Sequence, residues 1–225
     1  MCAAFVLAAC GFVDFEAREP GVLRGNLLVL WVGEGDNLGD GRFVFVPDPK
    51  QPLQFARDPK NGRDWVVEPQ AMYTDGGSIP RAAQAFQGLQ PWGYAPAYMI
   101  HDWLFVAKNC RTDGMATPKE AALADMSFQD SADILAEVIQ TLIRDKRVAP
   151  DDVAPPLISN VVAGLPTRAL WNAKGACASR RLSKDDQAAV DALFAPSRLR
   201  LLAPGAAPAI APNGPVARVV ASYSF

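Results

Sequence analysis

The feature that most constrains this chain is a change in hydrophobic periodicity at about residue 74. Before it, short apolar runs of strand length alternate with Gly, Pro and Asp-Gly turn signals, at 27–32, 42–46, 53–56 and 65–67. After it, apolar residues recur at the three- and four-residue spacing of amphipathic helices. Strands followed by helices predict an α+β fold, in which a small antiparallel sheet in the N-terminal half packs against helices.

Four helices are expected after this point. The first covers about 96–108, and the second begins at T-P-K-E, 117–120, which has the form of a capping box with proline in the first turn. The short connection between them predicts an antiparallel pair. Two further C-terminal helices are expected over about 156–174, bent at Pro166, and over about 183–194.

The chain of 225 residues is long enough for one domain, which we place at 20–195. The Ala/Pro-rich tail at 196–225 is expected to be loose. The formal net charge of −2 argues against a nucleic-acid partner. No protein partner is identifiable from the sequence, and no apolar run reaches the ~18–20 residues that span a bilayer.

Residues 1–10 are apolar and uncharged, and they end in L-A-A-C at Cys10. This ending resembles the lipobox of bacterial lipoproteins, in which the cysteine is acylated and becomes the mature N-terminus. The resemblance implies a lipoprotein signal segment, membrane lipid as a partner and a place in the cell envelope, although the cationic start of a signal peptide is missing. The alternative is an apolar first strand of a cytoplasmic protein.

Two other cysteines, Cys110 and Cys177, lie outside this segment in the helical part of the chain. No C-x-x-C pair is present, which argues against a structural zinc site. The two would pair as a disulfide in an oxidising compartment. We favour the alternative of two free, buried thiols, because unpaired cysteines are commonly buried as small apolar residues.

The chain has one histidine, His101. Three-histidine zinc sites, two-histidine-one-carboxylate sites and H-E-x-x-H proteases all need more imidazoles, so they are excluded within one chain. Any imidazole that acts as a general base must be His101.

Asp125 is the second unusual residue, because it falls on the apolar stripe of the second predicted helix. The other members of that stripe are Ala121, Phe128, Ala132, Leu135, Ile139 and Leu142. An ionised carboxylate on such a stripe needs a partner. His101 precedes the connection by about as many residues as Asp125 follows it, so the two are expected to meet across the helix interface. The pair would be either a catalytic dyad or a structural polar network.

A candidate metal site lies next to this pair. Asp102 is turned about 100° around the helix from His101. In the loop at 74–81, Gly76 and Gly77 would let backbone carbonyls approach a cation, and Asp75 would add a carboxylate. Such oxygen ligands suit Ca²⁺. The alternatives are a solvated helix residue for Asp102 and a turn residue for Asp75.

Two further residues of this loop are candidates for supporting roles. Ser78 would be the nucleophile in a variant mechanism with His101 as base, although the G-x-S-x-G elbow is absent. Arg81 would either pair with Asp75 or lie in water.

Three blocks in order resemble the bacterial and phage family of unknown function DUF1353. They are T-D-G-G-S-I-P-R at 74–81, A-P-A-Y-M-I-H-D-W-L-F at 95–105 and K-E-A-A-L-A-D-M-S-F at 119–128. The resemblance spans about residues 25–175. It implies the fold, but the family has no settled activity.

A second resemblance is to phospholipase A₂, where an H-D stretch on one helix faces an Asp on the antiparallel helix. It implies that His101 is the general base, that Asp102 is a calcium ligand and that Asp125 orients the base. Phe105 replaces the usual tyrosine, and the disulfide framework is absent. Together these features predict a calcium-assisted hydrolase of an ester, with a phospholipid as one candidate substrate. The alternative is a non-enzymatic phage- or envelope-associated module.

Overall fold

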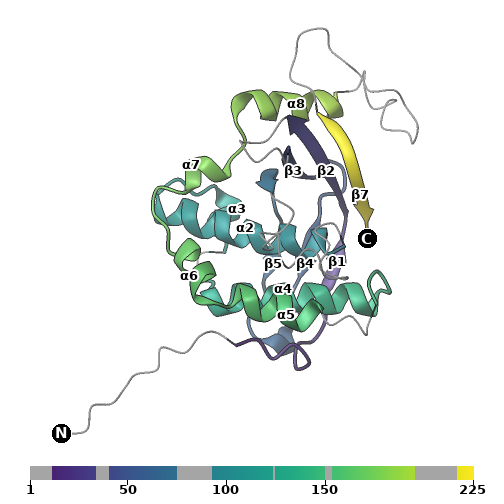
Figure 1. The fold of residues 1–225 in the computed structure, drawn as a ribbon, viewed down its shortest axis with the longest axis vertical. Coiled ribbons are helices and arrows are strands. Elements are labelled where there is room, and N and C mark those ends of the chain that lie inside the picture. The colour runs from purple at the N-terminus through teal and green to yellow at the C-terminus, as the bar shows by residue number, and fades with distance from the viewer. Residues whose placement is uncertain (1–11, 34–40, 75–92, 124, 150–153, 196–216) are drawn as a thin grey trace, which may run out of the picture.

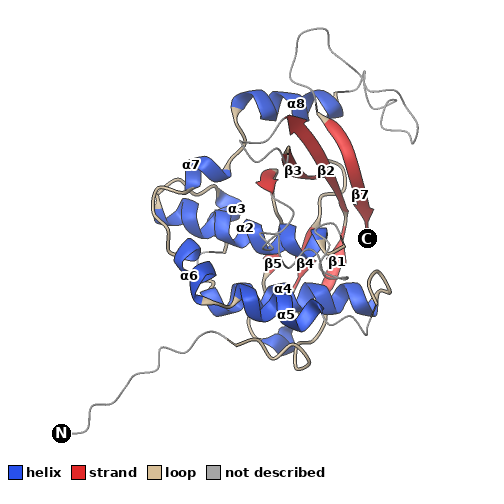
Figure 2. Cartoon of the chain, viewed as in Figure 1, coloured by secondary structure: helices blue, strands red, loops and turns tan. Residues whose placement is uncertain are grey.

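The computed structural model describes residues 12–33, 41–74, 93–123, 125–149, 154–195 and 217–225. The predicted α+β class is confirmed: antiparallel sheets come mostly from the N-terminal half, an antiparallel helix pair follows, and further helices lie toward the C-terminus (Figures 1 and 2). None of the helices in these residues is both long and apolar enough to cross a bilayer.

The strands are short. They are β1 (Val22–Arg24), β2 (Asn26–Gly33), β3 (Arg42–Pro47), β4 (Gln54–Ala56), β5 (Val66–Val67), β6 (Met72–Thr74) and β7 (Arg218–Ser224), with a 3-10 turn η1 (Pro59–Asn61) between β4 and β5. The predicted apolar runs correspond to β2, β3, β4 and β5, whereas β1, β6 and β7 were not predicted. The strands form two antiparallel sheets, with the strand orders β1-β4-β5 and β6-β3-β2-β7.

The helices are α2 (Ala95–Thr112), α3 (Pro118–Ala121), α4 (Phe128–Arg144), α5 (Ala154–Val162), α6 (Leu165–Trp171), α7 (Cys177–Arg180) and α8 (Lys184–Phe194). The single helix predicted over 156–174 is therefore two helices. They are separated because Gly164, the N-cap of α6, has an extended backbone, and Pro166 lies in the first turn of α6 rather than at a bend.

The last strand departs from the expectation of a loose tail. Residues 218–224 form β7, which pairs antiparallel with β2 from Asn26 to Trp31. The four-stranded sheet is therefore completed by residues from opposite ends of the chain (Figure 1). Residues 196–216 of the predicted tail lie outside the described part.

Both faces of the four-stranded sheet are covered. Val29 and Phe45 lie in the main core, whereas Leu30 and Val44 lie in a second cluster with Val190 of α8. Because successive side chains of a strand point to opposite faces, the continuous apolar run of β2 serves both cores.

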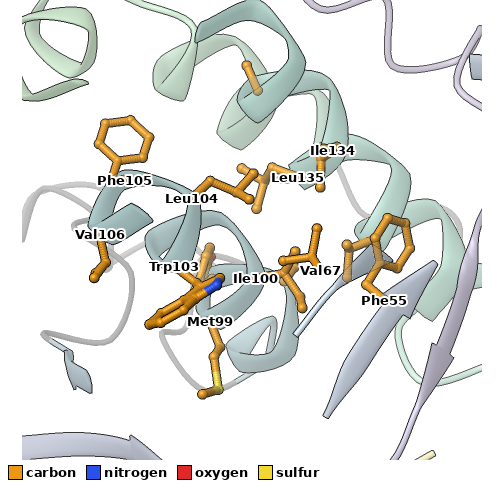
Figure 3. Packing of buried hydrophobic residues seen from close by; sticks show 14 of the residues in the cluster. Phe55, Val67, Met99, Ile100, Trp103, Leu104, Phe105, Val106, Ile134 and Leu135 are labelled. Carbon is orange, nitrogen blue, oxygen red and sulfur yellow. The ribbon is translucent and has the colours of Figure 1, made fainter. Parts of the chain in front are cut away.

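The main core lies where α2 and α4 pack against each other and against the smaller sheet. Figure 3 shows Ile100 and Leu104 of α2 close to Leu135 of α4, with Phe55 and Val67 of the smaller sheet beside them. All five side chains are almost completely buried. This packing fixes α2, the helix that carries His101 and Asp102, at the centre of the molecule.

The C-terminal end of α2 is held to the end of α6 and to the segment that follows it by one covalent and several polar contacts. Cys110 and Cys177 form a disulfide, with their Cα atoms 4.5 Å apart. The Asn109 side chain donates to the carbonyls of Leu170, Trp171 and Ala173. Our preference for two free thiols is therefore wrong, because folding brings two cysteines that are 67 residues apart in sequence into bonding range.

We expect reduction of this disulfide to lower the free energy of unfolding by about 2–4 kcal/mol, because the reduced unfolded chain is less constrained. Urea unfolding with and without dithiothreitol measures this difference. The Cys110→Ala/Cys177→Ala double variant is the control, since a reductant should not change its stability. Two free thiols at these positions in protein purified without reductant would contradict the structure.

Candidate functional site

His101 lies in the second turn of α2, with 6% of its surface exposed. Its ring packs against Phe105, one turn further along, at a centroid distance of 4.9 Å. Phe105 in turn meets Trp171 of α6 and Phe128 of α4 edge to face. One face of the imidazole is therefore set against an aromatic cluster where α2, α4 and α6 converge.

The two ring nitrogens of His101 have different surroundings. Nδ1 lies 3.6 Å from Oδ1 of Asp102, which is within ion-pair distance and just beyond the usual hydrogen-bond range. Nε2 is buried and has no hydrogen-bond partner among the described residues. A buried polar atom without a partner costs about 1–3 kcal/mol, so its presence in a folded protein calls for an explanation such as a bound water, a ligand or a catalytic role.

Asp125 does not occupy the predicted position. It lies between α3 and α4, its side chain is 67% exposed, and its carboxylate is 3.2 Å from Arg63. No hydrogen bond to His101 is found among the described residues. The expected His101–Asp125 contact is therefore wrong in this structure.

The physical reason is a second helix start within the predicted helix. Ser127 has an extended backbone and caps α4, and Asp130 completes a capping box with it. The predicted box at Thr117 and Glu120 is confirmed, but it begins only the four-residue helix α3. The members of the stripe beyond this break are buried as predicted, namely Phe128, Ala132, Leu135, Ile139 and Leu142.

The predicted calcium site is described only in part. Asp102 is on α2, with a side chain 24% exposed. The other candidates lie outside the described residues: Asp75, Gly76, Gly77, Ser78, Arg81 and, for lipid attachment, Cys10. The residues that the structure describes contain no cluster of three His, Cys, Asp or Glu side chains suited to a metal. Asp102 is the one predicted ligand among the described residues, so no step below is assigned to calcium.

A buried ionic network, which was not predicted from the sequence, joins the smaller sheet to α4. Arg57, which follows β4, donates from Nε and Nη2 to Glu137 at 2.9–3.1 Å and from Nη1 to Asp130 at 3.3 Å. Arg57 is 3% exposed and Glu137 is completely buried. The guanidinium also lies over the Trp65 ring. A sequence signal was available, because Asp130, Asp133 and Glu137 have the spacing of one helix face.

The two main partners of this network respond differently to burial. Burial raises the pKa of Glu137 to about 7, against the lowering effect of Arg57, and the nearby charge of Asp133 adds to the rise. Burial lowers the pKa of Arg57, but the hydrogen bonds and charges of Glu137 and Asp130 outweigh it and hold that pKa above its ordinary value. Arg57 therefore stays charged, whereas Glu137 exchanges a proton near neutral pH.

We expect the Glu137→Gln variant to gain stability relative to the wild type as the pH rises. Because the folded-state pKa of Glu137 is raised above its ordinary 4.5, the native state holds this proton more tightly than the unfolded chain. The wild type therefore loses stability between about pH 4.5 and 7, by about 1–3 kcal/mol, and the variant lacks this loss. Urea unfolding of both proteins at about pH 5 and about pH 8 measures the change. If the variant instead loses stability relative to the wild type between these two pH values, folding favours the carboxylate form of Glu137 over the protonated form.

Comparison with known proteins adds one finding. Residues 50–142 match the family model described as protein of unknown function, DUF1353. This match includes α2 and most of α4, and it is narrower than the span of about 25–175 that the sequence blocks suggested. No curated protein matches, and no solved structure matches. The predicted resemblance is thus confirmed as a match to the DUF1353 domain model over residues 50–142.

Proposed function

We propose that this chain is an ester hydrolase in which His101 is the general base and Asp102 orients it. The observation that carries the proposal is the asymmetry of the imidazole, with a carboxylate 3.6 Å from Nδ1 and no partner at Nε2 among the described residues. A carboxylate near Nδ1 favours the tautomer with its proton on that nitrogen, which leaves Nε2 as the basic one.

The reaction class follows from this arrangement. Nε2 would take a proton from a water molecule as that water attacks an ester carbonyl, and the Asp102 carboxylate would stabilise the imidazolium that forms. The imidazolium would then return the proton to the leaving alkoxide. The phospholipid substrate is carried over from the sequence resemblance and remains a prediction, as does the alternative use of Ser78 as nucleophile.

The burial of His101 sets a condition for this mechanism, because water has to reach Nε2. It also favours a second candidate function, a non-enzymatic phage- or envelope-associated module in which the imidazole fills a place in the core. The exposed position of Asp125 favours this alternative too, since the expected second carboxylate is not at the ring.

We propose the cell envelope as the location, with Cys10 acylated. The Cys110–Cys177 disulfide supports this, because disulfides persist mainly in oxidising compartments outside the cytosol.

Chemical modification tests the access of water and small reagents to His101. Because the chain has one histidine, every ethoxyformyl group that diethyl pyrocarbonate adds to an imidazole reports on this residue. The experiment uses the full chain without a histidine tag, and mass spectrometry follows the modification. We expect the reaction under native conditions to proceed at a measurable fraction of its rate in urea. Complete protection until the protein unfolds would support the non-enzymatic module.

Substitution tests the catalytic roles. With nitrophenyl esters of graded chain length and phospholipid vesicles as substrates, we expect His101→Gln to lower kcat at least ~10²-fold and Asp102→Asn to lower it less. Asp125→Asn is the matched control, because that exposed carboxylate should not affect the rate. Urea unfolding of each variant separates lost catalysis from lost folding. A wild type that cleaves none of these esters, together with a strongly destabilised His101→Gln variant, would contradict the proposal.

The calcium prediction has its own test. If Asp102 is a calcium ligand, Ca²⁺ raises the Tm of the wild type relative to EDTA, because a ligand that binds only the folded state stabilises it. Asp102→Asn should lose this shift, and Asp125→Asn should keep it. If the wild type has the same Tm in Ca²⁺ and in EDTA, the prediction that Asp102 is a calcium ligand is wrong.

A further inference from the structure

The described chain begins with an exposed phenylalanine that is fixed to the body of the protein. Phe12 is 72% exposed. Its carbonyl accepts a hydrogen bond from Nε2 of Gln129 at 3.0 Å, and the next amide, of Val13, donates to Oδ1 of Asn160 at 3.3 Å. Val13 itself is buried in the main core. The backbone at Phe12 is therefore held against α4 and α5.

Other large apolar side chains are exposed on the helices next to this point. Val161, adjacent to Asn160 at the end of α5, is 50% exposed, and Leu165 at the start of α6 is 58% exposed. We call Phe12, Val161 and Leu165 the apolar face. Phe12 and Val161 are the chain neighbours of Val13 and Asn160, which are joined by a hydrogen bond. Single exposed apolar residues need no explanation, but exposed apolar residues that lie close together indicate a contact surface.

The distance along the chain from Cys10 to this face is short. Two residues span at most about 7 Å when fully extended. If Cys10 carries the acyl anchor, Phe12 must then lie within about that distance of the anchored residue. So short a connection would keep the folded body at the membrane surface.

We infer that the apolar face lies against the lipid bilayer, with Phe12, Val161 and Leu165 entering the headgroup region. This inference rests on the proposed acylation of Cys10. It also sets the orientation of the molecule, because Figure 1 shows the described chain beginning near α5, at the end opposite α8. The sheet face covered by α8 and the start of β7 would then point away from the membrane.

The charges nearby indicate how the face would bind. Asp14 and Glu16, just after Phe12, are exposed, and so is one cation, Arg168, one turn after Leu165 on α6. Acidic side chains at the surface oppose attraction to anionic lipids, so apolar insertion rather than headgroup charge is expected to hold the face. Vesicles of phosphatidylcholine are therefore the appropriate probe.

Photo-crosslinking of the full chain from a lipoprotein-processing host tests the inference. Benzoylphenylalanine replaces Val161 in one variant and Val220 in a matched control. Val220 is 49% exposed on β7, which begins beside α8 at the far end (Figure 1). Mass spectrometry of the protein bound to the vesicles measures the yield of lipid adducts. We expect this yield to be at least ~10-fold higher for the label at 161 than for the label at 220. Equal yields, or none at 161, would overturn the inference.

The mass of the mature protein separates this inference from the proposals on which it rests. An acylated protein without adducts at 161 refutes the apolar face and leaves the envelope location intact. An intact Met1 without acylation refutes the proposed anchor, and failure of that protein to bind vesicles refutes the face as well. The hydrolase proposal is independent of these results, because its residues are on α2.

Discussion

The structure depends on the burial of α2 on nearly every side. Fourteen of its 18 residues are buried, against α4, both sheets and the segment that carries α6 and α7. A helix that is apolar all round needs such surroundings, and its polar side chains must find partners inside the protein. Asn109 finds three carbonyls, whereas Nε2 of His101 finds none among the described residues. Nε1 of Trp103 and Oδ1 of Asn109 are also buried without a partner among these residues. Of the three groups only the imidazole can accept a proton near neutral pH, so His101 is the candidate for function on this helix.

Two kinds of buried polar group are therefore present, and they have different consequences. Arg57 and Glu137 satisfy each other at the junction between the smaller sheet and α4, and their network is explained by the fold alone. Replacing one partner would leave a buried charge without compensation. His101 has a carboxylate at one nitrogen and leaves the other without a partner, which the fold does not require.

Much of the fold could be predicted because its signals are local. The apolar runs at 27–32 and 42–46 became β2 and β3 almost unchanged, since alternation and turn residues act within a few positions. The pairing of β7 with β2 could not be predicted in this way, because it joins opposite ends of the chain and leaves most of β7 exposed. The disulfide also depends on a contact far apart in sequence.

The site was predicted less well, for a reason that can be located. Ser127 and Asp130 repeat the capping signal that correctly identified Thr117 and Glu120. The apolar spacing continues through Ser127, so periodicity suggested one long helix where the local capping chemistry begins a new one. Asp125 was therefore assigned to a buried stripe, but it is in the connection between two helices. Where apolar periodicity and a capping signal disagree, the capping signal is the better guide to the residue at which a helix begins.

The central claim is that Nε2 of His101 is the basic nitrogen, and NMR of the imidazole tests it most directly. The single histidine gives one pair of ring ¹⁵N signals in a long-range ¹H–¹⁵N correlation spectrum. In the neutral ring the account predicts a proton on Nδ1, beside Asp102, and an unprotonated Nε2. Asp102→Asn should weaken this preference. A neutral ring with its proton on Nε2 would contradict the account, because the nitrogen proposed to accept the proton would already carry one.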